Sequence, residues 1–167
     1  ALLAGEEEAM LRAALLDIDP RQAPRRAAPP RAALEVGPAA AAALLAREGG
    51  VSLLDVRQPG EYRLDGHVDG SVNIPAYTWE HGYYLPSEDF VAEVRAAYAP
   101  DAPLVLLCAN GRMAQGAAAM LEEAAFTNVQ TLEGGLDAWS WEAEEEDGVP
   151  PLVVDDDGED ALPGAWV

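Results

Sequence analysis

Cys108, the single cysteine, is the residue of this chain best suited to covalent chemistry. It follows an apolar run, residues 103–107, that predicts a buried strand, and the turn-forming pair Asn110-Gly111 comes directly after it. Residues 112–124 then show a helical pattern. The thiol is therefore predicted where a strand gives way to a helix N-terminus. Backbone N–H groups and the helix dipole at such a place stabilise an anion, and a thiolate is one.

The charge balance excludes two classes of partner. The 167 residues include 30 Asp and Glu against 10 Lys and Arg, which gives a formal net charge of −20. A protein gains affinity for phosphate by supplying Lys and Arg, so we expect neither nucleic acid nor an anionic membrane surface as a partner. Every basic residue is Arg, and both a genomic base-composition bias and salt adaptation would explain that pattern.

Residue counts also limit the chemistry. One cysteine excludes an intramolecular disulfide, and two His leave no closed Cys/His metal site, so we expect no metal and no cofactor. No apolar run approaches the roughly 20 residues that a membrane helix needs, so we expect a protein that is not integral to a membrane. The chain opens on Ala rather than Met, which favours a processed or trimmed N-terminus.

Residues 1–31 are expected to form an N-terminal extension. Residues 1–19 place apolar side chains at helical spacing, which is typical of a short amphipathic helix docked on another surface; a loosely held tail is the alternative. Residues 20–31 hold four Pro and four Arg with no acid, which predicts an extended linker. This basic segment could bind an acidic partner or fold back on its own acidic body.

The middle of the chain alternates strands with helices. Pro38 opens one helix and Gly49-Gly50 follow its end, and Ser87 is expected to cap another. Such alternation predicts an α/β domain with a central parallel sheet flanked by helices. The predicted strands are 32–36, 51–56, 70–75, 103–107 and 128–132, and the predicted helices are 38–47, 87–97, 112–124 and a short one with Trp139.

The composition changes after Trp141. Residues 142–160 hold ten acids and no base, which predicts a solvated tail over 142–167. Within that tail the Val149-Pro150-Pro151 segment and Trp166 are expected to pack on a surface. The predicted organisation is therefore an N-terminal helix and linker over 1–31, a domain over 32–141 and an acidic tail over 142–167.

Three blocks of sequence resemble the signatures of the rhodanese family. The first block comprises residues 54–57, Glu61-Tyr62 and residues 66–75. The Cys108 loop resembles the rhodanese active-site loop, and Gly134-Gly135 followed by Trp139 resembles the C-terminal signature. The blocks occur in the family's order and separations. The resemblance implies a rhodanese-like three-layer domain with N- and C-terminal extensions, and the inserts at 77–90 and 122–129 are most similar to single-domain rhodaneses of plants and algae.

The resemblance implies a sulfurtransferase. Cys108, as a thiolate, would take a sulfane sulfur from thiosulfate or a persulfide and pass it to a thiol or to cyanide. Arg112 is expected to contact the substrate. The anion would be held by the loop amides, those of Ala109, Asn110, Gly111, Arg112 and Met113. A second set of residues is expected to support the site structurally: Asp55, Arg57, Glu61 and His67.

Loop length distinguishes sulfur transfer from phosphate chemistry. In sulfur-transferring members the loop runs six residues from the cysteine, here from Cys108 to Met113. The phosphatase spacing of Cys, five residues and Arg would put Arg at Ala114, so the resemblance disfavours a phosphatase or an arsenate reductase. Met113 departs from the pattern, because many active members carry Arg or a small hydroxyl residue there and Met donates no hydrogen bond.

Two functions stay open at this stage. One is a sulfurtransferase acting on a small-molecule sulfur donor and a thiol acceptor. The other is a catalytically weak or inactive module that serves as a binding or structural subunit of a larger complex, with 1–31 and 142–167 contacting a protein partner. Met113 and the acidic surface, which repels anionic donors, favour the second.

Two further expectations concern the aromatic residues of the 77–90 insert and the location of the protein in the cell. Trp79, Tyr83 and Tyr84 are expected either to rim the site or to cover the core. The resemblance and the processed N-terminus favour a plastid, as a soluble or peripheral protein, and the bacterial cytoplasm is the alternative location.

Overall fold

The structure is a computed structural model that describes residues 33–145 and 147–155. The predicted N-terminal helix, the Pro/Arg linker and Trp166 lie outside the described residues. All the described residues belong to the unit that begins at Ala32.

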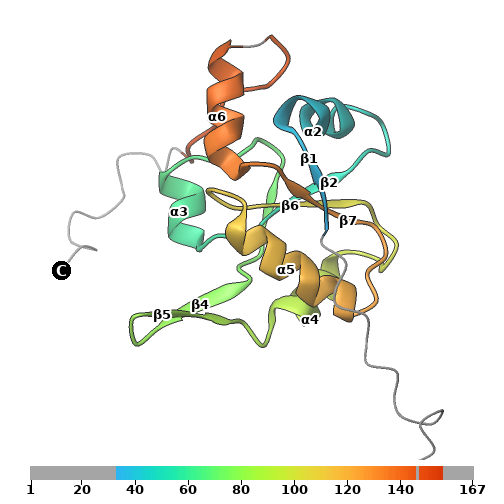
Figure 1. Cartoon of the computed structure of the whole chain (residues 1–167), viewed down its shortest axis with the longest axis vertical. Coiled ribbons are helices and arrows are strands. Elements are labelled where there is room, and N and C mark those ends of the chain that lie inside the picture. Colours follow the sequence, from blue (N-terminus) through green and yellow to red (C-terminus); the bar gives the residue numbers. More distant parts are fainter. Residues whose placement is uncertain (1–32, 146, 156–167) are drawn as a thin grey trace, which may run out of the picture. The chain divides into compact units, whose positions relative to one another are not determined.

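A five-stranded sheet forms the centre of the domain, with every neighbouring pair parallel (Figure 1). The strand order is β1-β7-β6-β2-β3. Central strands β2 and β6 are apolar on both faces because helices cover both sides of the sheet. The predicted fold class, an α/β domain around a parallel sheet, is confirmed. The strands are β1 (Leu34–Val36), β2 (Ser52–Asp55), β3 (Val72–Asn73), β6 (Leu104–Leu107) and β7 (Val129–Leu132).

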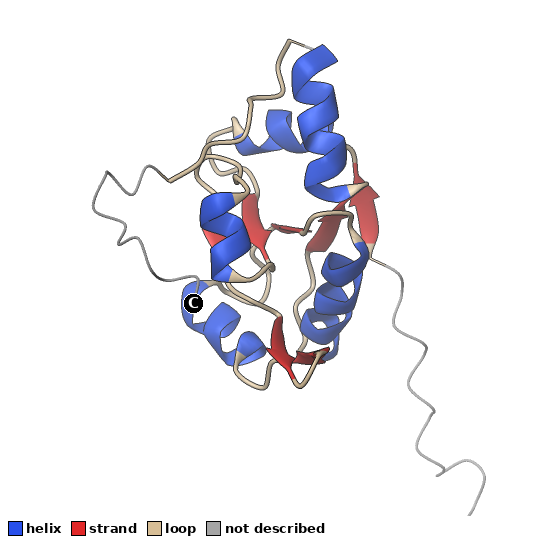
Figure 2. Cartoon of the chain, turned by 90° about the vertical axis from the view of Figure 1, so that its left-hand side faces the viewer, coloured by secondary structure: helices blue, strands red, loops and turns tan. Residues whose placement is uncertain are grey.

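Helices form two outer layers, as Figures 1 and 2 show. One layer contains α2 (Pro38–Leu45) and α6 (Gly135–Glu145), and the other contains α4 (Phe90–Ala97) and α5 (Arg112–Glu123). Alternate side chains of β6 enter two separate cores. Leu104 and Leu106 lie in the core with Phe90 and Leu121, whereas Val105 and Leu107 lie in the core with Ala41 and Trp139. This alternation fixes the three layers.

A helix and a two-stranded hairpin between β2 and α4 were not predicted. Helix α3 (Pro59–Leu64) buries no residue, so it has no apolar face that periodicity could reveal. Strands β4 (Tyr77–Glu80) and β5 (Tyr83–Pro86) form a separate antiparallel hairpin. Its two-residue turn, His81-Gly82, has φ values of 51° and 85°, the conformation of a hairpin turn with two left-handed residues.

The prediction that Ser87 caps α4 is wrong. The helix begins at Phe90, and Asp89 is the residue before it. The Ser87 N–H donates to the Ala76 carbonyl at 2.9 Å. That bond holds Ser87 at the end of the hairpin, so the helix starts later than its sequence signal suggests.

The segment after α6 returns to the domain. Val149 is buried, and the Trp139 indole N–H donates to the Pro150 carbonyl at 2.7 Å. Backbone groups of His67 and Val153 exchange hydrogen bonds of 2.9 and 2.8 Å. The Val-Pro-Pro segment therefore packs as expected, while the boundary placed at residues 141 and 142 stays a prediction.

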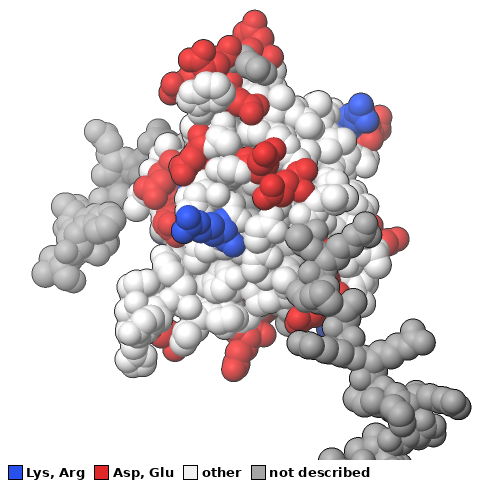
Figure 3. Space-filling view, viewed as in Figure 1, with Lys and Arg blue, Asp and Glu red and all other residues white. Residues whose placement is uncertain are grey.

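On the face shown in Figure 3, acidic side chains are more abundant than basic ones, and they gather over α6 and beside α3. Basic atoms form a smaller group between α3 and the start of α5. Among the described helices, none combines the length and the apolar composition that crossing a membrane requires.

Candidate functional site

Cys108 lies at the carboxyl end of β6, directly before α5. The neighbouring strand β2 ends at the same edge of the sheet, with Asp55. The thiol is 1% exposed, while Ala109 and Asn110 beside it are exposed. The sulfur is therefore located at the base of an open loop, at the edge where parallel sheets usually place their ligands.

Two backbone N–H groups donate to the Cys108 sulfur. Gly111 donates to Sγ at 3.1 Å and Ala114 at 3.4 Å. Gly111 has a φ of 91°, a conformation open to glycine, and this turns its N–H back toward the sulfur. The positive end of the 12-residue helix α5 points at the same atom. Both effects favour an anionic sulfur over a neutral one.

The start of α6 supports the loop from behind. The Leu136 N–H donates to the Cys108 carbonyl and the Asp137 N–H donates to the Ala109 carbonyl, each at 2.9 Å. Gly135 makes this approach possible: a Cβ there would lie 2.5 Å from the Cys108 carbonyl oxygen and 2.6 Å from that of Ala109. A helix far along the chain thus fixes the backbone of the cysteine loop.

Comparison with known proteins assigns this arrangement to a family. A family profile described as the rhodanese-like domain matches residues 38–142, which include the cysteine loop and its support in α6. The chain belongs to the rhodanese-like domain family. The resemblance of the three sequence blocks is thereby confirmed.

Bacterial proteins named thiosulfate sulfurtransferase GlpE are similar to this rhodanese-like domain. The protein from Pseudomonas paraeruginosa is 36% identical over 93 residues, covering 56% of this chain and 73% of its own. The one from Pseudomonas fluorescens is 36% identical over 106 residues, covering 62% and 85%. A solved structure of the Alr3790 protein from Anabaena sp. aligns with a TM-score of 0.56 at 23% identity, covering 71% and 81%. The plant and algal affinity stays a prediction.

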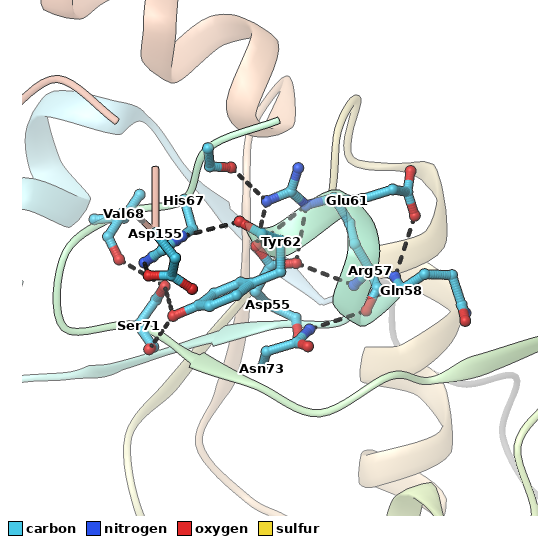
Figure 4. Close-up of polar contacts among 11 residues, drawn as sticks. Asp55, Arg57, Gln58, Glu61, Tyr62, His67, Val68, Ser71, Asn73 and Asp155 are labelled. Atoms are coloured by element: carbon cyan, nitrogen blue, oxygen red, sulfur yellow. Dashed lines mark hydrogen bonds and ion pairs between the residues drawn. The ribbon is translucent and has the colours of Figure 1, made fainter. Parts of the chain in front are cut away.

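Asp55 and Arg57 form a buried ion pair beside the rhodanese loop (Figure 4). Arg57 Nη2 lies 2.8 Å from Asp55 Oδ2, and the two side chains are 5% and 0% exposed. The same Nη2 donates to the Gly66 carbonyl at 2.8 Å. The Asn73 amide donates to the carbonyls of both pair members. The pair therefore ties the end of β2 to the segment that precedes β3.

His67 belongs to a second polar group in Figure 4. Its ring stacks on Tyr62 with centroids 3.8 Å apart, and Nδ1 lies 2.9 Å from the Tyr62 carbonyl. The Tyr62 hydroxyl donates to the Ser71 carbonyl at 2.8 Å. His67 Nε2 lies 3.6 Å from an oxygen of Asp155. The buried ring thus joins α3, the loop before β3 and the returning C-terminal segment.

Glu61 connects α3 to its surroundings. Its carboxylate accepts the Gln58 N–H at 3.1 Å, the reciprocal cap of a helix start. The Gln58 side-chain amide donates to the Tyr77 carbonyl, which links this helix to the β4–β5 hairpin. Glu61 also lines a hollow of about 190 Å³ together with Arg57 and Ala109. Two of the predicted supporting residues therefore reach the rim of the cysteine loop.

The remaining predicted loop residues have distinct surroundings. Arg112 is exposed, and its N–H donates to the Asn110 side-chain oxygen at 3.1 Å. Met113 is half-buried against the α4–α5 core. Of the five predicted amides, 109–113, Gly111 alone donates to Sγ among the described hydrogen bonds, and Ala114, which was not predicted, joins it.

Tyr77 is a neighbour of the site that sequence reasoning missed. Its hydroxyl lies against α5 at Gly116, where a Cβ would overlap it. Burial, and secondarily the charge of Cys108, raise the pKa of Tyr77 above 10.0. The phenol therefore stays neutral near the sulfur. Tyr77 is half-buried, while the aromatic residues considered instead, Trp79, Tyr83 and Tyr84, are exposed and do not cover the core. Alternation along β4 gives no signal for this difference, since Tyr77 and Trp79 are two residues apart on one strand and yet differ in burial.

Three further residues make hydrogen bonds beside the site. They lie in the first sequence block, but they were not predicted as site residues: Tyr62, Ser71 and Asn73. Within the described part of the chain, no group of three or more His, Cys, Asp or Glu side chains converges on a common point. The reactive group that the structure describes at this site is the Cys108 thiol, with the N–H groups of Gly111 and Ala114 as its donors.

Gly135→Ala is expected to destabilise the domain by about 2–3 kcal/mol, because the new Cβ meets two backbone oxygens at a φ of 63°. Displacement of the loop should also lower thiosulfate turnover by about 10²-fold. Urea denaturation measures the loss of stability, and the formation of thiocyanate from thiosulfate and cyanide measures the turnover. The matched control is Gly60→Ala, whose Cβ has no neighbour within 4 Å; equal losses in both variants would contradict the explanation.

Proposed function

We propose that this rhodanese-like domain is a sulfurtransferase that carries sulfur as a persulfide on Cys108. The observation that carries the proposal is the pair of backbone N–H groups on Sγ, from Gly111 at 3.1 Å and Ala114 at 3.4 Å. They favour a thiolate before the reaction and an anionic sulfur after it. The names of the bacterial relatives, thiosulfate sulfurtransferase, support the same chemistry.

In the first step the Cys108 thiolate attacks the outer sulfur of thiosulfate. A Cys–S bond to that sulfur forms, the sulfur–sulfur bond of thiosulfate breaks, and sulfite leaves with the bonding electrons. In the second step cyanide or a thiolate attacks the outer sulfur of the persulfide. Thiocyanate, or a new persulfide on the acceptor, then leaves and the Cys108 thiolate is regenerated. The cycle needs no oxidant or reductant.

Arg112 is the residue proposed to attract an anionic donor. It is exposed at the first position of α5, next to the loop. Arg57, the other nearby guanidinium, is paired with the buried carboxylate of Asp55, so its charge is offset. The loop amides of Ala109, Asn110, Arg112 and Met113 are proposed to contact the donor or the outer sulfur.

Ala114 argues against phosphate chemistry at this loop. A phosphatase-type arginine would have to occupy this position, yet Ala114 is fully buried in the α4–α5 core. Its N–H is also occupied by the cysteine sulfur. Both observations favour sulfur over phosphate as the group that this loop binds.

Thiosulfate, cyanide and the full chain provide the direct test. We expect thiocyanate to form catalytically, and we expect intact mass spectrometry after thiosulfate treatment to show a gain of one sulfur atom on Cys108. The proposal fails if no thiocyanate forms and neither thiosulfate nor an organic persulfide ever loads the cysteine.

Met113→Arg is expected to raise kcat/KM for thiosulfate by about fivefold, because a cation beside the loop attracts the dianion. The matched control is Met120→Arg. Met120 lies on the same helix and is likewise half-buried against the same core. The Met120→Arg substitution adds the same charge and bulk two helical turns away from Met113, and it should not raise turnover. An equal gain in both variants would show that net charge, and not the loop position, limits the donor.

The second candidate function is that of a weakly active binding subunit in a larger complex, plastid or otherwise. Met113, an apolar residue packed into the core at the last loop position, favours it. Under this alternative, residues 1–31 or 142–167 contact the partner. Because the segment around Pro150 and Val153 bonds to the domain, the test removes 1–31 or 156–167, and either deletion should release the protein from its complex. Catalytic loading of Cys108 at a useful rate would argue against it.

A further inference from the structure

The β4–β5 hairpin presents large apolar side chains to solvent. Trp79 is 58% and Tyr83 is 70% exposed, and Tyr84 and Leu85 are each 45% exposed. Because side chains alternate along a strand, Trp79 and its cross-strand partner Tyr84 lie on one face of the hairpin, and Tyr83 and Leu85 lie on the other. An isolated two-stranded sheet gains little from such exposure, so the exposed Trp79–Tyr84 pair marks an interaction site. Figure 3 shows a largely uncharged surface over the hairpin, while the acidic side chains of the same face gather mainly over α6 and beside α3.

The hairpin and α3 enclose a groove of about 470 Å³. Trp79 and Tyr84 face each other across the strands, with ring centroids 4.7 Å apart at 65°, and together they form one wall. Leu64 on α3, which is 53% exposed, forms the opposite apolar wall. Gln58 bonds α3 to the start of β4, so the two walls are held together. The groove is thus preformed.

Carboxylates give the groove a negative charge. Glu61 and Asp65 line it, and none of its described lining residues is basic. Aromatic faces next to carboxylates attract Lys and Arg, which gain from the charge and from the rings together. An apolar side chain beside the cation would fill the space between Leu64 and Trp79. The groove therefore suits a basic segment with an apolar residue, and it would repel an acidic one.

The groove adjoins the cysteine loop. Glu61 and Asp65 line both the groove and the smaller hollow of about 190 Å³ that Ala109 borders. A chain seated between α3 and the hairpin could therefore extend along these two carboxylates to the residue that follows Cys108. Small donors need no such surface, whereas a thiol carried on a protein does.

We propose that the groove between α3 and the β4–β5 hairpin docks a basic, apolar segment of a partner protein whose cysteine exchanges sulfur with Cys108. This deepens the proposed function and rests on it for the sulfur step, but the docking is a separate property. A Lys or Arg of the partner pairs with Asp65 and Glu61, and its apolar neighbour packs on Trp79 and Tyr84.

Two synthetic peptides test the docking on the full chain. One is acetyl-Gly-Arg-Leu-Arg-Gly-Ser-amide, and its twin has Glu in place of both Arg residues. Because neither contains Trp, intrinsic tryptophan fluorescence reports binding, and calorimetry gives the affinity. We expect the basic peptide to bind at least about tenfold more tightly than the acidic one at physiological salt.

Matched variants locate the binding. Trp79→Ala and Asp65→Asn are each expected to weaken binding of the basic peptide by about fivefold. Trp141→Ala and Asp101→Asn remove an equally exposed indole and an exposed carboxylate from other elements, and should change it less than about twofold. Equal losses in the test and control variants would mean that the peptide follows the overall negative charge, which would overturn the proposal.

Sulfur transfer separates docking from chemistry. For this test both peptides carry Cys in place of the terminal Ser. The basic peptide should accept sulfur from loaded Cys108 with a lower KM than its acidic twin. Trp79→Ala should remove that difference and leave transfer to dithiothreitol unchanged.

Binding without any transfer would defeat the proposed function but keep the docking site. Transfer to dithiothreitol without preference between the peptides would defeat the docking alone. If sedimentation shows dimers that Trp79→Ala dissociates, a second copy occupies the groove and the proposal is wrong.

Discussion

Replacement of Cys108 by Ser is expected to lower thiocyanate formation from thiosulfate and cyanide by about 10⁴-fold, to the level of the uncatalysed reaction. A serine hydroxyl is a far weaker nucleophile toward sulfur, and no other thiol in the chain can replace the lost one. After thiosulfate treatment the variant should also lack the added sulfur atom in its mass spectrum. These losses are the largest that any single substitution in this domain is expected to cause in activity.

The fold should survive this change. Serine is slightly smaller than cysteine, and its oxygen accepts the N–H groups of Gly111 and Ala114 that now reach the sulfur. The melting temperature should therefore stay within a few degrees of the wild type. Sulfur loading or turnover that persists in a folded Cys108→Ser protein would contradict the proposed nucleophile.

Arg57→Ala is expected to cost about 3–5 kcal/mol of folding free energy, because it leaves the fully buried carboxylate of Asp55 without its cation. The Gly66 carbonyl would lose its donor as well. Chemical denaturation near neutral pH measures the effect.

The exposed Arg95 provides the matched control for this prediction. It makes one described hydrogen bond, to the Ala124 carbonyl at 2.9 Å, so Arg95→Ala should cost less than about 1 kcal/mol. The double variant Asp55→Ala/Arg57→Ala should lose clearly less folding free energy than the two single variants together, because no unpaired charge then remains buried. Additive losses would indicate that the two side chains stabilise the domain independently.

The central sheet and the cysteine loop could be predicted because their signals are local and agree with one another. The apolar run of β6, the Asn110-Gly111 turn and the alanine-rich helix α5 follow one another without interruption. Strand β6 is buried throughout and carries the continuous apolar sequence expected of a strand covered on both faces, and the centre of β2, Leu53 and Leu54, does the same. The predicted fold class therefore needed no long-range information.

The surroundings of the thiol could not be predicted to the same degree. Ala114 contributes a backbone N–H, and an amide has no side-chain identity for a sequence pattern to reveal. Helix α3 and the hairpin form at the surface, where no buried face imposes an apolar periodicity on the sequence. The burial of Tyr77 depends on its contact with α5 and not on neighbours along the chain.

The returning segment after α6 affects how the molecule can be divided for experiments. The family match ends at residue 142, yet the Trp139 indole donates to Pro150, and Leu152 lines the hollow that Ala109 borders. A fragment cut at the family boundary would therefore leave a buried indole N–H without its acceptor and open the back of the cysteine loop to water. Such a fragment would report on a weakened site, and for this chain a minimal catalytic piece should extend at least through Asp155.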